Sequence, residues 1–233
     1  MTSHQPPATS HGFFVTGTDT GVGKTLVACA LLAAFGERGM KAVGMKPVAC
    51  GVESGPGGLV NDDVERLIGA SNVAAPREHV NPYCFAPPIA PHIAAQQAGV
   101  TILLDRIEQS FRTLAAQAEV VVVEGVGGFH VPLGPGTDST QLAARLALPV
   151  VMVVGMRLGC LNHALLTERA VAGSGLKLAG WIANHIDPQM PAADDNVRAL
   201  EERIGAPRIA RISFAQVPDT RSLVAALAGG KPE

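Results

Sequence analysis

Residues 17–25 have the composition of a phosphate-binding loop. They read Gly-Thr-Asp-Thr-Gly-Val-Gly-Lys-Thr, between an apolar run at residues 13–15 and a segment rich in Leu and Ala. In such an arrangement backbone N–H groups and the positive end of a helix face an anion, and the lysine adds a mobile charge. The usual spacing would put the first glycine at position 18, so this loop is one residue longer. A glycine loop that only turns the chain is the alternative, but Gly-Lys-Thr between a strand and a helix favours a nucleoside triphosphate site with Lys24 on the phosphates.

Oxygen-bearing side chains that could hold a magnesium ion occur in three places. Thr25 follows the loop lysine, Glu124 ends an apolar run at residues 120–123, and Asp62 and Asp63 begin a predicted helix. Mg²⁺ prefers hard oxygen ligands, commonly a few from the protein together with phosphate and water. Glu124 would lie at the C-terminal end of a buried parallel strand, where ligands bind, although a solvated strand end is its alternative role. Helix capping is the alternative for the two aspartates, and we expect it to account for one of them.

Lys46 is a second candidate for catalysis. It ends a predicted strand at residues 41–45, and the proline that follows stops that strand. Parallel strands end at one edge of a sheet, so Lys46 would lie beside the phosphate loop. A cation there can neutralise the charge that develops during phosphoryl transfer. A surface lysine before a turn is the alternative, and the presence of Lys24 favours the catalytic role.

Strand and helix patterns alternate along the chain. Strands are predicted at residues 13–15, 41–45, 120–123, 149–154, 176–183 and 208–212. Helices are predicted at residues 26–38, 64–68, 92–98, 102–117, 137–146, 161–171, 192–204 and 219–228. This alternation predicts an α/β fold with a mainly parallel central sheet flanked by helices, like that of P-loop NTPases. We expect a flexible tail at residues 1–11 and a single domain at residues 12–230.

Two segments are predicted to be loops. Residues 51–58 contain four glycines and one proline. Residues 76–91 are rich in proline, which excludes a central strand or a long helix, and they contain Tyr83, the only tyrosine. We expect the second segment to be a shaped surface loop, and long loops in compact domains are often functional.

Composition excludes several classes of protein. The chain is 47% hydrophobic and 16% charged, so it can bury a large core. Its 18 basic and 20 acidic residues give a net charge of −2, which argues against nucleic acid or an anionic membrane as a partner. The sequence predicts neither a signal peptide nor a membrane-spanning run. The cysteines occur singly, without metal-binding spacing, which favours reduced thiols in a cytoplasmic protein; they are Cys29, Cys50, Cys84 and Cys160.

The motifs together resemble one family, the dethiobiotin synthetases. The match covers the phosphate loop with its extra residue and a series of blocks in family order, over most of the chain from residue 13 to residue 184. After the loop, these blocks are Lys46-Pro47-Val48-Ala49, Val80-Asn81-Pro82-Tyr83, Pro91-His92-Ile93, Val123-Glu124-Gly125 with Gly127-Gly128, Leu158-Gly159-Cys160-Leu161-Asn162-His163-Ala164 and Ala179-Gly180-Trp181-Ile182-Ala183-Asn184. Their joint order and spacing make the resemblance far more specific than the loop alone.

The resemblance implies an ATP-dependent ligase of biotin synthesis. Its substrates would be 7,8-diaminononanoate, CO₂ or bicarbonate, and ATP, and it would close a cyclic urea through a carbamate and a carbamic–phosphoric anhydride. Lys24 and Lys46 would be the catalytic residues, while Thr25, Asp63 and Glu124 would hold Mg²⁺.

The resemblance also implies which residues contact the nucleotide and the substrate. The nucleotide would contact Thr20, Gly21, Val22, Gly23, Lys24, Thr25, Leu26, Asp63, Glu124, Gly125, Val126, Gly127, Asn184, His185, Ser213, Phe214 and Ala215. The substrate would contact Cys50, Gly159, Cys160, Leu161 and Asn162. The last four form a predicted helix start, which is a ready site for a carboxylate. In the family this turn binds the substrate carboxylate across a homodimer interface, so a homodimer is expected.

Three features depart from the family pattern, and one of them is Phe129-His130, which replaces a more usual aromatic pairing after the glycines. Cys50 stands where the family generally has a hydroxyl near the substrate, so this thiol could instead line the pocket as a small apolar group. The late adenine block is Ile212-Ser213-Phe214-Ala215, which lacks the family proline.

Two other kinds of protein share this type of loop. ParA- or MinD-like ATPases, which bind partners under nucleotide control, carry a second signature lysine near the loop start, where this chain has Asp19. The ATP-using domain of a cobyrinic-acid amide synthase would normally need a glutaminase domain, for which 233 residues leave no room.

Overall fold

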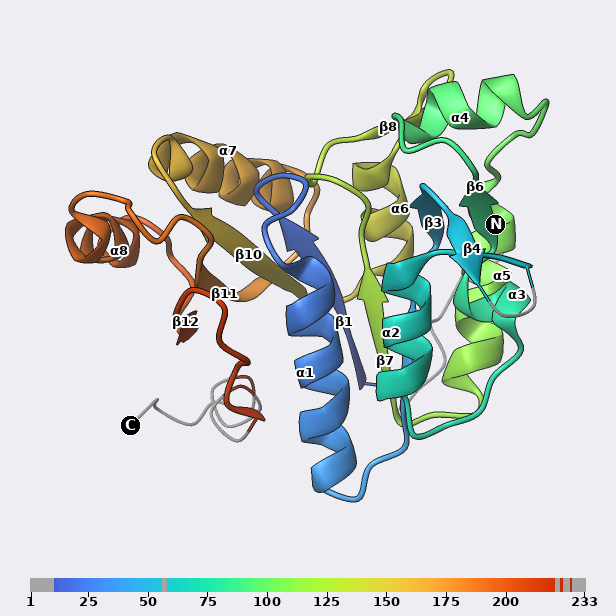
Figure 1. Cartoon of the computed structure of the whole chain (residues 1–233), viewed down its shortest axis with the longest axis horizontal. Coiled ribbons are helices and arrows are strands. Elements are labelled where there is room, and N and C mark those ends of the chain that lie inside the picture. Colours follow the sequence, from blue (N-terminus) through green and yellow to red (C-terminus); the bar gives the residue numbers. More distant parts are fainter. Residues whose placement is uncertain (1–10, 56–57, 221–222, 224–226, 228–233) are drawn as a thin grey trace.

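A parallel sheet of six strands forms the centre of the computed structural model, which describes residues 11–55, 58–220, 223 and 227 (Figure 1). The strand order is β12-β11-β10-β1-β7-β2, and every neighbouring pair runs parallel. The strands of this sheet are β1 His11–Gly17, β2 Ala42–Met45, β7 Val120–Glu124, β10 Val150–Met156, β11 Leu178–His185 and β12 Arg208–Ile212. The predicted α/β fold is confirmed.

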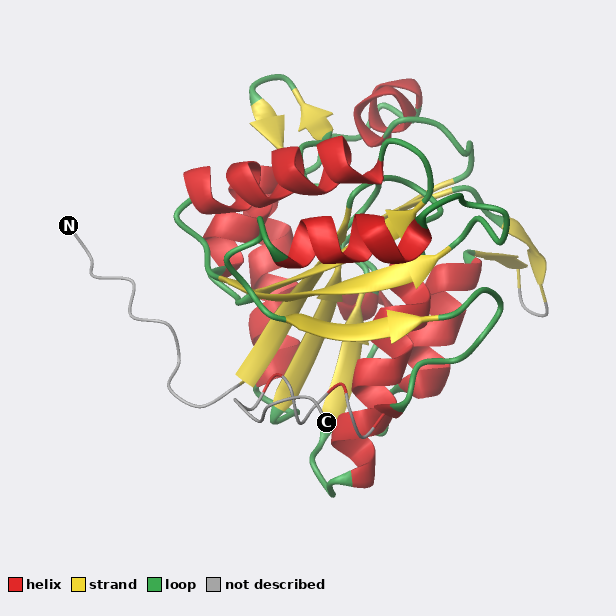
Figure 2. Ribbon diagram, turned by 90° about the vertical axis from the view of Figure 1, so that its left-hand side faces the viewer, coloured by secondary structure: helices red, strands yellow, loops and turns green. Residues whose placement is uncertain are grey.

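Helices cover both faces of this sheet (Figure 2). The helices of the described residues are α1 Lys24–Glu37, α2 Asp62–Ala70, α3 Arg77–Val80, α4 Pro91–Gln97, α5 Leu104–Ala115, α6 Ser139–Leu146, α7 Cys160–Gly173 and α8 Ala193–Glu201. The remaining short strands are β3 Val48–Cys50, β4 Glu53–Gly55, β5 Gly58–Val60, β6 Tyr83–Phe85, β8 Pro132–Gly134 and β9 Thr137–Asp138. The predicted closing helix at residues 219–228 and the predicted tail fall largely outside the described residues, and the single-domain prediction stays untested.

The core lies on both sides of the sheet because successive strand residues point to opposite faces. Phe14 packs with α5 and α6, whereas its neighbour Val15 packs with α1. A third apolar cluster lies between the β10–β11 end of the sheet and helices α7 and α8, and it contains the buried Trp181. β7 and β10 are buried along their whole length, which explains their uninterrupted apolar sequences.

Both predicted loops contain regular structure. The first includes the antiparallel pair β4–β5. In the second, β6 pairs with β3, and Tyr83 is 4% exposed, so the expected surface loop is wrong for this part. Asn81 explains this burial because its Nδ2 donates to the carbonyls of Lys46 at 2.6 Å and of Tyr83 at 3.0 Å. These bonds tie the proline-rich segment to the end of β2.

Two further observations concern the cysteines and the lengths of the helices. The four cysteines are free thiols, as expected. Among the described residues no helix has the length and apolar character needed to cross a bilayer.

Candidate active site

The phosphate loop links β1 to α1 and adopts a backbone that needs glycine. Gly21 and Gly23 have φ angles of 73° and 96°, in the left-handed region that side chains disfavour. A Cβ on Gly23 would lie 2.3 Å from Nδ2 of Asn184. Asn184 is the penultimate residue of β11 and donates from Nδ2 to the carbonyl of Val22 at 2.7 Å. The loop is therefore shaped by its glycines and held against the edge of the sheet.

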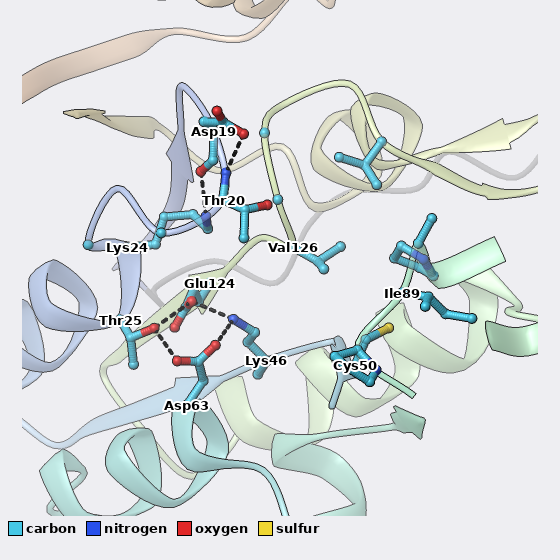
Figure 3. A pocket seen from close by; sticks show the side chains of 18 of the residues that line it. Asp19, Thr20, Lys24, Thr25, Lys46, Cys50, Asp63, Ile89, Glu124 and Val126 are labelled. Atoms are coloured by element: carbon cyan, nitrogen blue, oxygen red, sulfur yellow. Dashed lines mark hydrogen bonds and ion pairs between the residues drawn. The ribbon is translucent and has the colours of Figure 1, made fainter. Parts of the chain in front are cut away.

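Lys24 is the first residue of α1 and is 6% exposed. Its Nζ donates to the backbone carbonyl of Asp19 at 2.9 Å, so the side chain folds back over the loop (Figure 3). Burial and, next, the charge of Lys46 lower the pKa of Lys24 to about 8. Near neutral pH this lysine keeps a proton that it holds only weakly.

Thr25, Asp63 and Glu124 meet although they come from α1, α2 and β7. The Thr25 hydroxyl lies 2.7 Å from Oδ1 of Asp63 and 2.9 Å from Oε1 of Glu124. A hydroxyl has one proton, so it can donate to only one of these two oxygens at a time. Glu124 is 1% exposed, and its Oε2 is buried without a hydrogen-bond partner among the described residues. This excess of buried oxygens over donors fits a small divalent cation such as Mg²⁺.

Lys46 follows β2 and bridges the two carboxylates (Figure 3). Its Nζ lies 2.7 Å from Oδ2 of Asp63 and 2.5 Å from Oε1 of Glu124. Burial would lower the pKa of Lys46, but the charges of Glu124 and Asp63 outweigh burial and raise this pKa. Burial also raises the pKa of Glu124, against the pull of Lys46. For Asp63 burial is outweighed by Lys46, and its pKa is lowered.

These groups face one cavity of about 810 Å³. Its polar side holds the phosphate loop, both lysines and the oxygen cluster. The apolar part of its lining is contributed by Pro88, Ile89, Pro91, Val126 and Val131. One cavity can therefore accept phosphate groups at one side and a hydrocarbon at the other.

Twelve of the predicted site residues line this cavity. Those that do are Thr20, Gly21, Gly23, Lys24, Thr25, Leu26, Lys46, Cys50, Asp63, Glu124, Val126 and Gly127. Predicted site residues outside the lining are Val22, Gly125, Gly159, Cys160, Leu161, Asn162, Asn184, His185, Ser213, Phe214 and Ala215. Cys50 faces the cavity next to the proline-rich segment, consistent with a small group that lines the pocket.

The predicted base-binding residues gather at the same sheet edge as the loop. Asn184 pairs with Ile212 in the parallel register of β11 and β12, so residues 213–215 begin beside the end of β11. His185 accepts at Nε2 a hydrogen bond of 2.9 Å from Nε of Arg211. Burial and then the Arg211 charge lower the pKa of His185, which favours the neutral imidazole. Contact of these residues with a base stays a prediction.

The predicted carboxylate turn begins α7. Gly159 has a φ angle of 95° and precedes the helix, which starts at Cys160, one residue before the predicted start. The Cys160 side chain is 1% exposed, and its N–H donates to the carbonyl of Arg157 at 3.0 Å. Both groups of Cys160 are thus already used inside the protein, so a carboxylate would depend on the other residues of the turn.

The structure also corrects one assignment and adds residues. Asn61 caps α2 by accepting from the Val64 N–H at 3.3 Å. The expectation that Asp62 or Asp63 caps this helix is therefore wrong. Arg66 lines the cavity one helical turn after Asp63, a spacing that could have indicated it. Pro88 to Pro91 also line the cavity, and the proline content alone could not have shown this.

Comparisons with known proteins identify the family of this chain and agree with its fold. The model of a family described as an AAA domain matches residues 11–220. The chain is 54% identical over 212 residues to the ATP-dependent dethiobiotin synthetase BioD of Nitrosospira multiformis, covering 91% of this chain and 92% of that protein. It is 52% identical over 215 residues to the protein of the same name from Aromatoleum aromaticum, covering 92% and 96%.

Solved structures of low sequence identity share the fold. MinD from Pyrococcus horikoshii, complexed with Mg-ADP, aligns with a TM-score of 0.55 at 16% identity, covering 92% of this chain and 86% of that one. A ParA family ATPase from Chlorobium tepidum aligns with a TM-score of 0.53 at 15% identity, covering 96% and 90%. These likenesses confirm the P-loop NTPase-like fold alone. The high identity over nearly full length decides the family: the chain belongs to the ATP-dependent dethiobiotin synthetases.

Proposed function

We propose that this protein closes the ureido ring of dethiobiotin from 7,8-diaminononanoate and CO₂ at the expense of ATP. The main support is the cavity, in which a phosphate loop, two lysines and an oxygen cluster face an apolar wall. Phosphoryl transfer needs cations around the phosphates, and a nine-carbon substrate needs an apolar surface. The relatives named as dethiobiotin synthetases support the same reaction.

The first step would form a carbamate. The lone pair of one substrate amine attacks the carbon of CO₂, a C–N bond forms, and the amine proton leaves to water. Lys46 would stabilise the resulting anion because it is a buried cation whose pKa is raised by its carboxylate neighbours.

The next steps would activate the carbamate and close the ring. A carbamate oxygen attacks the terminal phosphorus of ATP, and the bond from that phosphorus to ADP breaks. The second amine then attacks the carbamate carbon, phosphate leaves with the electrons of the C–O bond, and a proton is lost. The products are dethiobiotin, ADP and phosphate. Lys24 would stay on the phosphates throughout, since its Nζ already lies over the loop.

Thr25, Asp63 and Glu124 are the residues that would hold Mg²⁺. The buried Oε2 of Glu124, which lacks a partner among the described residues, supports this assignment. A bound Mg²⁺ would neutralise phosphate charge during the transfer. Lys46 shares both carboxylates with that site, so it would turn toward the substrate when the carboxylates bind the ion.

The substrate chain would lie along the wall formed by Pro88, Ile89 and Pro91. Its carboxylate would bind at the turn of residues 159–162, at the N-terminus of α7. This turn does not line the cavity of its own chain, which supports a homodimer in which one copy completes the site of the other. The base would contact Asn184, His185 and residues 213–215.

A labelling assay tests this function. The purified protein is incubated with Mg-ATP, 7,8-diaminononanoate and ¹³C-bicarbonate, and the products are measured by mass spectrometry. We expect dethiobiotin carrying the label, with ADP formed in equal amount, and no product when any one component is omitted. ATP hydrolysis stimulated by DNA or lipid, without labelled product, would instead identify a ParA- or MinD-like ATPase.

A further inference from the structure

Arg157 contacts the phosphate loop although it lies between β10 and α7. Its Nη2 forms an ion pair with Oδ2 of Asp19, 138 positions earlier in the chain. The other carboxylate oxygen of Asp19, Oδ1, accepts from the N–H of Thr20 at 2.7 Å. The backbone carbonyl of Asp19 accepts from Lys24. Asp19 is therefore bound to the loop by two of its groups and to Arg157 by a third.

Asp19 poses an electrostatic problem for a nucleotide site. It lines the cavity, and its carboxylate accepts from the N–H of Thr20 in the phosphate loop. A negative charge there repels a triphosphate unless a cation compensates it. Lys24 contacts the carbonyl of Asp19 and not its carboxylate, so the ion pair to the carboxylate comes from Arg157.

The loop does not depend on Arg157 for its attachment to the sheet. The Thr18 N–H donates to the carbonyl of Val153 at 3.0 Å, and the Thr18 hydroxyl accepts from the Gly155 N–H at 3.3 Å. These bonds already fix the loop to β10. Because the Arg157 and Asp19 side chains are 43% and 45% exposed, their pair contributes little to folding and acts chiefly through charge.

We propose that Arg157 is a positioning residue for ATP. Its charge neutralises Asp19, so that the phosphate loop can accept a triphosphate. The inference rests on the proposed function for the identity of the nucleotide. Arg157 also lies two residues before Gly159, so the same side chain connects the nucleotide loop with the turn proposed for the substrate carboxylate.

A double-mutant cycle measured by calorimetric titration of ATP and of ADP tests the proposal. Arg157→Ala exposes the Asp19 charge, so ATP should bind about 10-fold more weakly. ADP, which carries less charge, should lose less affinity. Asp19→Asn keeps the Oδ1 that accepts from Thr20 and removes the charge, so it should not weaken binding. The double variant should return to within about 2-fold of the unmodified protein, because neither charge remains.

Two further variants separate this effect from a structural one. Arg157→Lys keeps the charge and should keep most of the affinity. Arg145→Ala removes a comparable exposed arginine that pairs with Asp105 away from the cavity, and it should change nothing. The deficit of Arg157→Ala should also shrink at high salt, because a Debye length of about 10 Å at 0.1 M falls as salt rises.

Unchanged ATP affinity in Arg157→Ala would overturn the proposal. So would a deficit that persists in the double variant or that does not respond to salt, because either result removes Asp19 from the cause. Titration measures binding without turnover, so the proposed ligase function and the role of Arg157 can be refuted independently. A protein that shows the cycle but makes no dethiobiotin refutes the ligase function, and one that makes dethiobiotin without the cycle refutes the role of Arg157.

Discussion

Lys24 and Lys46 lie in one cavity but in opposite electrostatic settings. Lys24 contacts a neutral carbonyl, and burial, followed by the charge of Lys46, lowers its pKa to about 8. Lys46 lies between two carboxylates, which raise its pKa despite its burial. Lys24 holds its proton weakly until an anion arrives to stabilise the charged form. Lys46, in contrast, keeps its charge over a wide pH range.

The lowered pKa of Lys24 makes ATP binding depend on pH. Phosphate favours the protonated lysine, so affinity should be full well below pH 8 and should fall as the pH rises above about 8. Binding should be accompanied by proton uptake near pH 8. Lys24→Arg should bind with affinity nearly independent of pH, because arginine stays charged. Titrations of ATP at several pH values, in buffers of different ionisation heat, check this. An equal decline of ATP affinity with pH in the unmodified protein and in Lys24→Arg would count against Lys24.

Lys46→Ala should abolish ligation while ATP still binds. Loss of the cation removes stabilisation of the carbamate, so kcat should fall by about 10³-fold. The variant also leaves Asp63 and Glu124 unpaired, which should cost about 3 kcal/mol of unfolding free energy in the absence of Mg²⁺. Mg²⁺ can replace the lost charge, so it should raise the melting temperature of Lys46→Ala more than that of the unmodified protein. Lys41→Ala removes an exposed lysine and serves as the control. Retained turnover would exclude Lys46 from catalysis.

At the scale of elements, the site is built where strands end and helices begin. β1 leads into the loop and α1, β2 leads to Lys46, and β7 ends in Glu124, all at one edge of the sheet. This edge also receives the end of β11, where Asn184 holds the loop. A parallel sheet therefore delivers groups that are distant in the sequence to one place, as expected for open α/β folds.

The protein should be sensitive to alanine substitution at Gly23 in the phosphate loop and should tolerate it at Gly69 in α2. Gly23→Ala adds a Cβ 2.3 Å from Asn184 at a φ of 96°, so we expect a loss of about 1–3 kcal/mol in unfolding free energy and a large loss of ATP affinity. Gly69 lies in α2, where an added Cβ meets nothing within 4 Å. Gly69→Ala should gain up to about 1 kcal/mol without affecting ATP. Chemical denaturation and ATP titration of both variants check this, and equal effects would contradict the role of the Asn184 contact.

At the scale of the whole molecule, the proposed homodimer makes a prediction about α7. Leu158 is 92% exposed directly before the carboxylate turn, and Leu166 on α7 is 55% exposed. Leu158→Asp should weaken the association and raise the KM for 7,8-diaminononanoate, while the KM for ATP stays the same. Leu103→Asp, at another exposed leucine that precedes α5, is the matched control. Sedimentation velocity and steady-state kinetics test this, and an active monomer would reject a site shared between copies.

The sequence by itself determined the features that depend only on residues close together in the chain. The glycine loop with Lys24, the buried run that ends in Glu124 and the alternation of strands and helices are local patterns, and their geometry follows from backbone rules. These patterns were enough to predict the parallel sheet and the groups at its edge. The family resemblance selected Asp63 among the metal candidates.

Only the tertiary structure decided how distant segments meet. Asp63 turns toward Thr25 while the side chain of Asp62 is 77% exposed, because adjacent helical residues point in different directions and the docking of α2 chooses one. Burial of Cys160 and the pairing of Arg157 with Asp19 likewise depend on how α7 and β10 pack. The contact of Arg157 with Asp19 joins positions 138 residues apart, and its geometry is set by the packed sheet and not by local spacing.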